Sequence, residues 1–290
     1  MNELPKMGGG GTSGTAAGPY KDLYIYLLKG VVEEQYESHF GTSFIGNWVE
    51  DDSSFLFFGR PADKEVGRLL RTRPKLELIE IHQFTYEQWQ GGGLRPLRVG
   101  DFVVVPPWEK KGAGENGIRI LLDPGVVFGN GLHPTTRDCL RALLIAKRQR
   151  AFKKVLDLGT GTGVLALAAA FLGAESVLAV DINPLCVKTT AKNVEMNGLG
   201  EVIRVVDGPA EDFVGEPADL AVANIHHEVI KRLLASGGLG DTERFIISGL
   251  MRSQFRDVKN ELEMSHFRIL REWDHDMTWF TLLAENESYL

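Results

Sequence analysis

A glycine-rich turn is the part of the sequence best suited to chemistry. The short apolar run Lys154-Val155-Leu156 leads into Asp157-Leu158-Gly159-Thr160-Gly161-Thr162-Gly163, and an apolar helix is expected to begin at once. Glycine at Gly159, Gly161 and Gly163 lets the backbone turn sharply and lets a ligand approach main-chain N–H groups. About 20 residues further on, a second predicted strand ends in Asp181, whose carboxylate could accept hydrogen bonds from both ribose hydroxyls. The pattern predicts a site for a nucleoside-containing cofactor.

Two classes of enzyme share this plan, the nicotinamide dehydrogenases and the methyltransferases that use S-adenosylmethionine. The dehydrogenase pattern is Gly-x-Gly-x-x-Gly, in which the helix start faces a pyrophosphate. This chain has the shorter Gly-x-Gly-x-Gly spacing, with Asp157 just before it. S-adenosylmethionine has no pyrophosphate, and its ammonium and carboxylate require one acceptor and several donors. Asp157 and the amides of the turn could supply both, so we interpret the segment as an S-adenosylmethionine site.

A third polar feature is Asn224, which ends the apolar run from Leu220 to Ala223. Ligands of open α/β sheets bind at the carboxyl ends of the strands, so Asn224 is a candidate for cofactor binding and catalysis. Alternatively, Asn224 could cap a helix that starts near Glu228. The neighbouring His226 and His227 could suggest a metal, but no cysteine or carboxylate set stands at ligand spacing, and we expect none.

The segment from Leu122 to Thr136 reads as a glycine-rich loop before an amphipathic helix. Thr135 is a possible N-cap, since Asp138 follows three residues later as in a capping box. Capping alone would not require the full pattern Phe-Gly-x-Gly-x-His-Pro-Thr-Thr that runs from Phe128 to Thr136.

Alternating strands and helices must position these residues. From Ile118 onward the order predicts a parallel sheet of βαβ units. The expected strands are IRILLD, KVLDLG, SVLAVDI, VIRVVDG, LAVANI and RFIISGL, and HFRILREW and MTWFTLLA are expected to form an antiparallel pair at one edge.

The front of the chain shows a different order of elements and no catalytic pattern. Between Asp22 and His82 the order is β-α-β-β-α-β, which is that of a ferredoxin-like unit, and we interpret it as a binding module. The helical stretches are VVEEQYESHF and ADKEVGRLLR. The expected domains are a flexible tail over 1–19, the ferredoxin-like domain over 20–84, a linker over 85–115 and the methyltransferase domain over 116–290.

Composition narrows the possible partners. The chain has 290 residues, 43% hydrophobic, and a net charge of −7, with no basic stripe for nucleic acid, so a basic protein or small molecule suits it better as substrate. No apolar run approaches the roughly 18 residues that a membrane span needs, and the first residues do not resemble a secretory signal. Cys139 and Cys186 match no zinc or redox spacing, which is typical of buried thiols in a reducing cytoplasm. The oligomeric state is left open.

The motifs together resemble the PrmA family, the methyltransferases of large-subunit ribosomal protein eleven. The resemblance covers about residues 86–285 and rests on the Phe128–Thr136 pattern, LDLGTGTGVLALAAAFLGA, VLAVDINPLCV, NVEMNG and ADLAVANI. It implies a seven-strand, doubly wound Rossmann-like domain behind a small ferredoxin-like substrate-recognition domain. It also implies that Thr136, Gly159, Asp181 and Asn224 bind S-adenosylmethionine, with Asn224 near the acceptor nitrogen. The family methylates amino groups on lysine side chains and an N-terminal α-amine.

Two departures from the family pattern fall near the expected methyl-transfer centre. The loop reads Gly-Asn-Gly-Leu-His where the family usually has Gly-Thr-Gly-Thr-His, and Asn-Ile-Leu becomes Asn224-Ile225-His226. His133, His226 or His227 could accept the proton of the amine, although water could also take it. Two alternatives therefore stay open beside a ribosomal-protein methyltransferase: an enzyme for another protein or a small amine, and a non-catalytic S-adenosylmethionine sensor.

Overall fold

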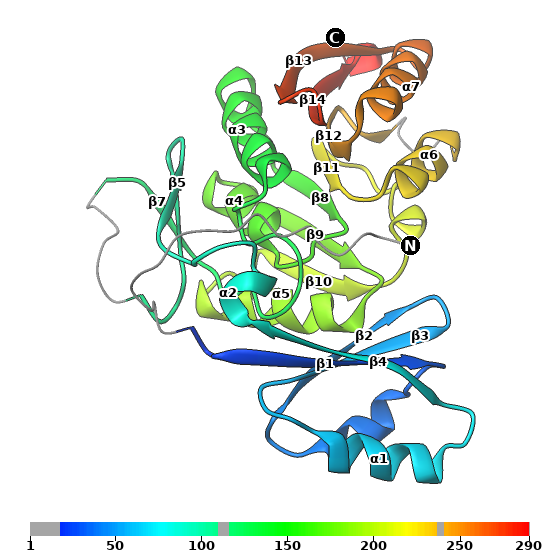
Figure 1. Cartoon of the computed structure of the whole chain (residues 1–290). Helices are drawn as coiled ribbons and strands as arrows, with labels where there is room; N and C mark the ends of the chain where they lie inside the picture. Colours follow the sequence, from blue (N-terminus) through cyan, green and yellow to red (C-terminus); the bar gives the residue numbers. More distant parts are fainter. Residues whose placement is uncertain (1–17, 110–115, 237–240, 290) are drawn as a thin grey trace. The chain divides into compact units, whose positions relative to one another are not determined.

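The computed structural model describes residues 18–109, 116–236 and 241–289 (Figure 1). Contacts divide them into two units. Unit 1 holds the described residues up to Arg95 with Trp108 and Glu109, and unit 2 holds Pro96–Pro107 and the described residues from 116 onward. The tail expected over 1–19 lies outside the described residues except for Gly18 and Pro19.

Unit 1 is an antiparallel sheet with two helical elements packed on it. Its sheet order is β2-β3-β1-β4, from β1 (Asp22–Lys29), β2 (Phe44–Glu50), β3 (Ser53–Phe58) and β4 (Glu77–Thr85). The core joins the sheet residues Tyr26, Leu56 and Phe58 to Val66 and Leu69 of α1 (Asp63–Thr72). A short helix α2 (Tyr86–Trp89) follows β4. The strand and helix order therefore follows the sequence-based prediction.

The first helical stretch of unit 1 differs from its prediction. The α-helix expected over VVEEQYESHF is a seven-residue 3-10 helix, η1 (Glu34–Phe40), which buries only Phe40. Its N-cap residue Glu33 makes no side-chain cap bond. So short a segment, with one buried anchor and no cap, gains little from the α-helical hydrogen-bond pattern.

Unit 2 contains a seven-stranded sheet covered by helices on both faces (Figure 1). The order is β10-β9-β8-β11-β12-β14-β13, from β8 (Lys154–Leu158), β9 (Ser176–Asp181), β10 (Ile203–Asp207), β11 (Leu220–Asn224), β12 (Arg244–Leu250), β13 (Phe267–His275) and β14 (Trp279–Asn286). The first five of these strands are parallel neighbours, whereas β14 runs antiparallel to β12 and β13. The antiparallel edge pair expected from the sequence is confirmed.

The apolar runs of the sequence explain why this sheet has two covered faces. In β11 four consecutive residues, Leu220 to Ala223, are buried, as expected of a parallel strand with helices on both sides. One core includes residues of α3 (Pro134–Gln149), α4 (Val164–Phe171) and α5 (Pro184–Met196). The other includes residues of α6 (His227–Ala235) and α7 (Arg252–Met264). The seven-strand, doubly wound prediction is confirmed for unit 2.

The strand expected at IRILLD does not join this sheet. It is β7 (Ile118–Leu121), which belongs to a three-stranded sheet with β5 (Leu97–Val99) and β6 (Phe102–Val105). One side of β7 pairs with β6, and on the other side the Leu121 backbone is bonded by the Asn197 side chain. Both hydrogen-bonding sides are therefore used without the main sheet. Much of the segment predicted as a linker thus packs as part of unit 2 from Pro96 onward.

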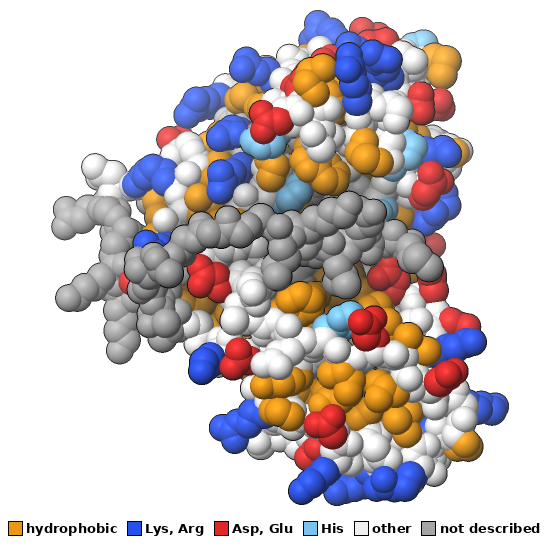
Figure 2. Space-filling view, viewed as in Figure 1, with side chains coloured by type: hydrophobic (Ala, Val, Ile, Leu, Met, Phe, Trp, Pro, Cys, Tyr) orange, Lys and Arg blue, Asp and Glu red, His pale blue; other side chains and the backbone are white. Residues whose placement is uncertain are grey.

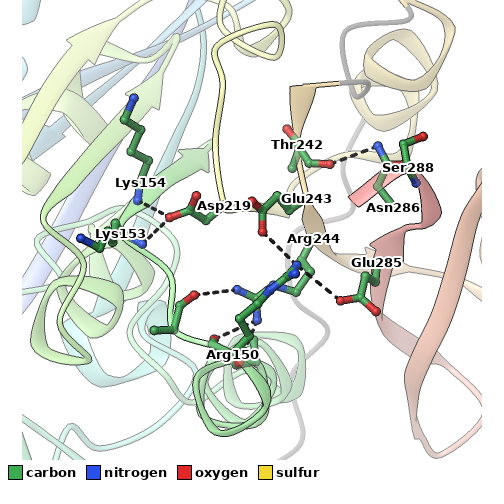
Figure 3. A network of polar contacts seen from close by, with 12 residues as sticks. Arg150, Lys153, Lys154, Asp219, Thr242, Glu243, Arg244, Glu285, Asn286 and Ser288 are labelled. Carbon is green, nitrogen blue, oxygen red and sulfur yellow. Dashed lines mark hydrogen bonds and ion pairs between the residues drawn. The ribbon is translucent and has the colours of Figure 1, made fainter. Parts of the chain in front are cut away.

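A buried arginine ties the amino end of β12 to the end of α3 (Figure 3). Arg244 is 1% exposed, and its guanidinium donates to the carbonyls of Ala146, Arg150 and Ala151 at 2.8, 3.0 and 3.3 Å. The last carbonyls of a helix lack intrahelical donors and carry partial negative charge, so a cation satisfies them well. Arg150 in turn pairs with Glu243 at 2.9 Å. This network holds one end of α3 against the sheet.

Two features of composition have structural counterparts. Cys139 and Cys186 are free, buried thiols, and burial raises the pKa of Cys139 to about 12. No helix in the described part of the chain is long and apolar enough to cross a membrane. The same residues contain no group of three His, Cys, Asp or Glu side chains that could hold a metal ion.

Candidate active site at the ends of the parallel strands

Three sequence-predicted site residues lie at one edge of the main sheet. Asp157 stands near the end of β8, Asp181 ends β9 and Asn224 ends β11. These strands are neighbours in the order β9-β8-β11, and all three are parallel. Between β8 and β11 the strand order reverses, which is where open α/β sheets bind ligands. The structure therefore brings the three side chains to a single binding edge.

The glycine turn between β8 and α4 requires glycine for steric reasons. Gly159, Gly161 and Gly163 have φ values of 76°, 57° and 82°, in the left-handed region that other residues rarely adopt. A Cβ on Gly159 would lie 2.0 Å from Ile225 Cγ2, and one on Gly161 would lie 2.6 Å from the carbonyl oxygen of Phe128. The turn is thus fitted closely to the segments beside it.

The amides of the turn are used differently from the sequence-based expectation. Gly159 and Thr160 N–H donate to the carbonyl of Val180 at 2.8 and 2.9 Å, and Gly161 N–H donates to Asp181 Oδ2 at 2.9 Å. The remaining two, of Thr162 and Gly163, donate to the carbonyls of Phe128 and Thr160. The turn therefore fixes its own shape, and the donors for a cofactor carboxylate must come from elsewhere.

Asp157 is a buried carboxylate with one oxygen left over. It is 1% exposed, and its Oδ2 accepts from Thr160 Oγ1 at 2.7 Å and from Ala166 N–H at 3.1 Å. Its Oδ1 has no hydrogen-bond partner among the described residues. Burial raises its pKa to about 6 against the effect of these two bonds, and the charge of Asp181 adds to the rise. A cation bound at Oδ1 would compensate the buried charge.

Asp181 is held in place by backbone donors. Its Oδ1 accepts from Asn183 N–H and its Oδ2 from Gly161 N–H, each at 2.9 Å. Burial raises its pKa, while these two bonds act in the opposite direction. The next residue, Ile182, is 70% exposed although it is apolar. Sequence reasoning did not name Ile182 as a candidate site residue. The pattern that could have indicated it is an apolar residue directly after Asp181, the acidic residue that ends β9.

The helix α3 starts differently from its prediction. His133 is the N-cap, and its Nδ1 accepts from Thr135 N–H at 3.4 Å. The expected cap at Thr135 with Asp138 is wrong, because Pro134 has a φ suited to the first helical position and lacks an N–H that would need a partner. Asp138 pairs with Arg141 at 2.7 Å instead.

Thr136 carries an unsatisfied hydroxyl at this helix start. It is 1% exposed, and its Oγ1 is buried without a hydrogen-bond partner among the described residues. A buried polar atom of this kind costs about 1–3 kcal/mol unless it is paired, so it points to a ligand. The helix N-terminus also favours an anion. The Thr136 hydroxyl is therefore a candidate donor to a cofactor carboxylate, in place of the turn amides that already have acceptors.

Asn224 offers an amide that the fold does not use. The helix after it begins at His227, with His226 at the N-cap position and no side-chain cap bond, so the interpretation of Asn224 as a cap is wrong. No hydrogen bond of the Asn224 side chain occurs within the described ranges. Its Oδ1 lies against Gly249, where a Cβ would stand 3.3 Å away.

Comparison with known proteins places this chain in a family. The model of the family described as ribosomal protein L11 methyltransferase (PrmA) matches residues 62–287. A relative of that name from Geobacillus kaustophilus is 39% identical over 239 residues, which cover 78% of this chain and 72% of the relative. Another from Geobacillus thermodenitrificans is 36% identical over 265 residues, covering 86% and 80%.

The chain belongs to the ribosomal protein L11 methyltransferase family. It is similar to the solved ribosomal protein L11 methylase from Lactobacillus delbrueckii subsp. bulgaricus, with a TM-score of 0.56, 27% identity, and coverage of 66% of this chain and 98% of that one. The chain is thus a protein methyltransferase that uses S-adenosylmethionine, as the glycine turn predicted. The family match also begins earlier than the resemblance seen by inspection, since it includes α1 and β4 of unit 1.

Aromatic residues that sequence reasoning did not single out lie beside His133. The His133 ring lies 5.4 Å from the ring of Phe128 and 5.0 Å from that of Trp279. Burial lowers the pKa of His133, and the nearby His275 adds to the effect. His227 has a buried Nε2 without a hydrogen-bond partner in the described part of the chain. A sequence pattern could not show that residues 128 and 279 both lie beside His133.

The raised pKa of Asp157 predicts a pH dependence of cofactor binding. The cofactor ammonium favours the charged carboxylate, so we expect affinity for S-adenosylmethionine to fall about tenfold per pH unit below pH 6. Because the pKa is raised in the folded protein, Asp157 lowers the stability of the free protein as pH rises from 4 to 6, and bound cofactor offsets that loss. Calorimetric Kd values between pH 5 and 8 check this. The Asp157→Asn variant should bind weakly with a flatter profile, and equal wild-type affinity at pH 5 and 7 would contradict the assignment.

Proposed function

We propose that this methyltransferase modifies ribosomal protein L11 in the cytoplasm, on lysine side chains, the N-terminal α-amine or both. The observation that most supports this proposal is a set of three polar groups that have no hydrogen-bond partner among the described residues. They are Asp157 Oδ1, Thr136 Oγ1 and the Asn224 amide. Ser248 pairs in register with Asn224, and its hydroxyl donates to the carbonyl of Thr135 at 3.5 Å. The start of α3 therefore stands next to the end of β11.

Each group suits one part of the reaction. Asp157 would accept from the cofactor ammonium and Thr136 would donate to its carboxylate. Asp181 would accept from the ribose hydroxyls, and the exposed Ile182 would pack on the base. Gly159, Gly161 and Gly163 would shape the turn against which the cofactor lies, and Asn224 would orient the acceptor amine.

The chemistry then needs positioning more than acid–base catalysis. The lone pair of a neutral amine attacks the sulfonium methyl, the new N–C bond forms as the C–S bond breaks, and S-adenosylhomocysteine leaves. Holding the reacting atoms in line can supply about 7–11 kcal/mol of the barrier. A free lysine has a pKa near 10.4, and a desolvated slot lowers it. The proton goes to water before docking or to His227 Nε2, a buried ring nitrogen that has no hydrogen-bond partner among the described residues.

Unit 1 supports a role in recognising the protein substrate. We assign it to the ferredoxin-like class, because its antiparallel order β2-β3-β1-β4 and its strand–helix sequence fit that plan. Its edge strand β4 exposes Leu78, Ile79 and Ile81 at 37%, 53% and 45%. Figure 2 shows hydrophobic side chains gathered on one face of this unit. Exposed apolar patches of this kind commonly bind proteins.

A double substitution on β4 tests this role. Ile79→Lys with Ile81→Lys removes apolar contact and adds positive charge against a basic substrate. We expect KM for ribosomal protein L11 to rise about tenfold, while Kd for S-adenosylmethionine stays unchanged. Steady-state kinetics and calorimetry measure the two quantities. A control with Lys64→Gln on α1, which also changes surface charge in this unit, should leave both unchanged. An unaltered KM in the double variant would place recognition elsewhere.

Mass spectrometry tests the proposed substrate. The full-length protein is incubated with S-adenosylmethionine and purified ribosomal protein L11, and methyl additions are mapped to lysine or the N-terminus. A parallel incubation with cell lysate reports any other substrate. Methylation of a different protein or a small amine alone would replace the proposed substrate. Binding of S-adenosylmethionine with no methyl transfer in either mixture would favour a sensor.

A further inference from the structure

Two asparagines, Asn193 in α5 and Asn197 directly after its last residue, bond to the backbone of other segments. Asn193 is 0% exposed, and its amide accepts from Asp123 N–H at 2.9 Å and donates to the carbonyls of Asp123 and Thr162 at 2.9 and 2.8 Å. Asn197 accepts from Leu121 N–H at 3.0 Å and donates to the Leu121 carbonyl at 2.7 Å. Each amide thus bonds both backbone groups of one residue, as a neighbouring strand would.

The spacing of these contacts explains why two asparagines four residues apart can do this. Residues 193 and 197 are about one helical turn apart, which is roughly 6 Å along the helix axis. Leu121 and Asp123 are two residues apart in extended chain, which spans about 6.6–6.8 Å, and their backbone groups point to the same side. The two periods match closely. The two asparagine side chains therefore make the hydrogen bonds that a second neighbouring strand would make to residues 121 and 123.

The same contacts reach the cofactor turn. The carbonyl of Thr162, which accepts from Asn193, lies between Gly161 and Gly163. Thr162 also donates from N–H to the carbonyl of Phe128 at 3.1 Å and from Oγ1 to that of Gly129 at 2.8 Å. Residues 122–133, the loop between β7 and α3, are thus bonded to the glycine turn at one point and to α5 at another. Asn193 joins the three segments.

We propose that Asn193 and Asn197 are positioning residues for the methyl donor. They fix the 122–133 loop and the glycine turn relative to each other before the donor binds. Neither side chain is assigned a contact with the donor or the acceptor. We call the glycine turn and the 122–133 loop together the cradle. This loop leads directly to His133 and Thr136, so the bonds of the two asparagines fix both the cradle and the Thr136 hydroxyl that would donate to the donor's carboxylate. This inference rests on the proposed roles of the turn and Thr136.

Replacing Asn193 with leucine tests the proposal in the full-length protein. Leucine has a similar volume but makes none of the three bonds. We expect Kd for S-adenosylmethionine to rise at least about tenfold, because the free energy of ordering the cradle now opposes binding. KM for the donor should rise in parallel, with kcat at saturating donor largely kept. The matched control is Asn286→Leu, which removes a 3% exposed amide of unit 2 that bonds Thr242 and Ser288.

A purely structural role predicts a different result. Both variants would then lower the melting temperature, and both would keep the wild-type Kd at temperatures where they are folded. That result would overturn the proposal. If Asn193→Leu does not fold, Asn197→Ala gives the second test. We expect its Kd to rise about threefold or more, because it loses the two Leu121 bonds and the bond to the Asn193 carbonyl but keeps the bonds of the Asn193 side chain. A wild-type chain that binds no S-adenosylmethionine would instead sink the proposed function itself.

Discussion

Replacing Asn224 with alanine is expected to lower kcat and kcat/KM together by about 100-fold or more. Its amide has no structural partner in the described residues and ends β11 at the binding edge. If the amide orients the acceptor amine, its loss acts on the transition state, and small misplacements of reacting atoms can cost about 100-fold. Steady-state kinetics on the methylated substrate, with methyl transfer followed by mass spectrometry, measures the change.

Two further measurements separate this role from a structural one. The melting temperature of Asn224→Ala should stay close to that of the wild type, because the side chain caps no helix. Asn224→Gln keeps the amide but moves it by one methylene, and it should also be slow if position matters. Full turnover per folded molecule in Asn224→Ala would remove Asn224 from the catalytic assignment.

Gly161→Ala is expected to weaken S-adenosylmethionine binding severely. A Cβ at this position would stand 2.6 Å from the Phe128 carbonyl oxygen, and that oxygen is backbone and cannot rotate away. The turn must therefore open, and it would carry with it the Asp181 carboxylate that accepts from Gly161 N–H. We expect affinity to fall at least about 100-fold, as about 2.7 kcal/mol of preorganisation is lost. Calorimetry with the purified variant gives the value.

Gly198→Ala is the matched control for this steric argument. Gly198 has a φ of +67°, close to the +57° of Gly161, yet an added Cβ there would meet nothing within 4 Å. Both variants pay about 1–2 kcal/mol for the left-handed backbone, so their stability losses should share that amount. Only Gly161→Ala should lose the cofactor. Equal binding in the two variants would show that the close approach to Phe128 is not essential.

Much of the site could be predicted because it sits on short local signals. Asp157, Asp181 and Asn224 each stand at the end of an apolar run, and parallel strands bring such ends to one edge. The glycines mark backbone that other residues rarely adopt, and the structure has all three at positive φ. These inferences need only the period of a strand and the place where it stops.

Other features depend on which segments meet, and the sequence does not state this locally. The apolar run at Ile118 predicts a strand, but its partner is β6 and not the main sheet, because Asn197 occupies its other side. The turn amides were expected to be free, yet Val180 and Asp181 accept from three of them. The unpaired hydroxyl of Thr136 is visible only once its surroundings are known.

The bonds of Arg244 also bear on how unit 2 folds and unfolds. They join β12 to the end of α3 across sequence separations of 98, 94 and 93 residues. Contacts that close such long loops are entropically costly, and we expect these bonds to form after the transition state for folding. Interactions absent from the transition state act on the rate of unfolding and leave the rate of folding nearly unchanged. We therefore expect the buried guanidinium to act mainly on the rate at which the native unit unfolds, and little on the rate at which it forms.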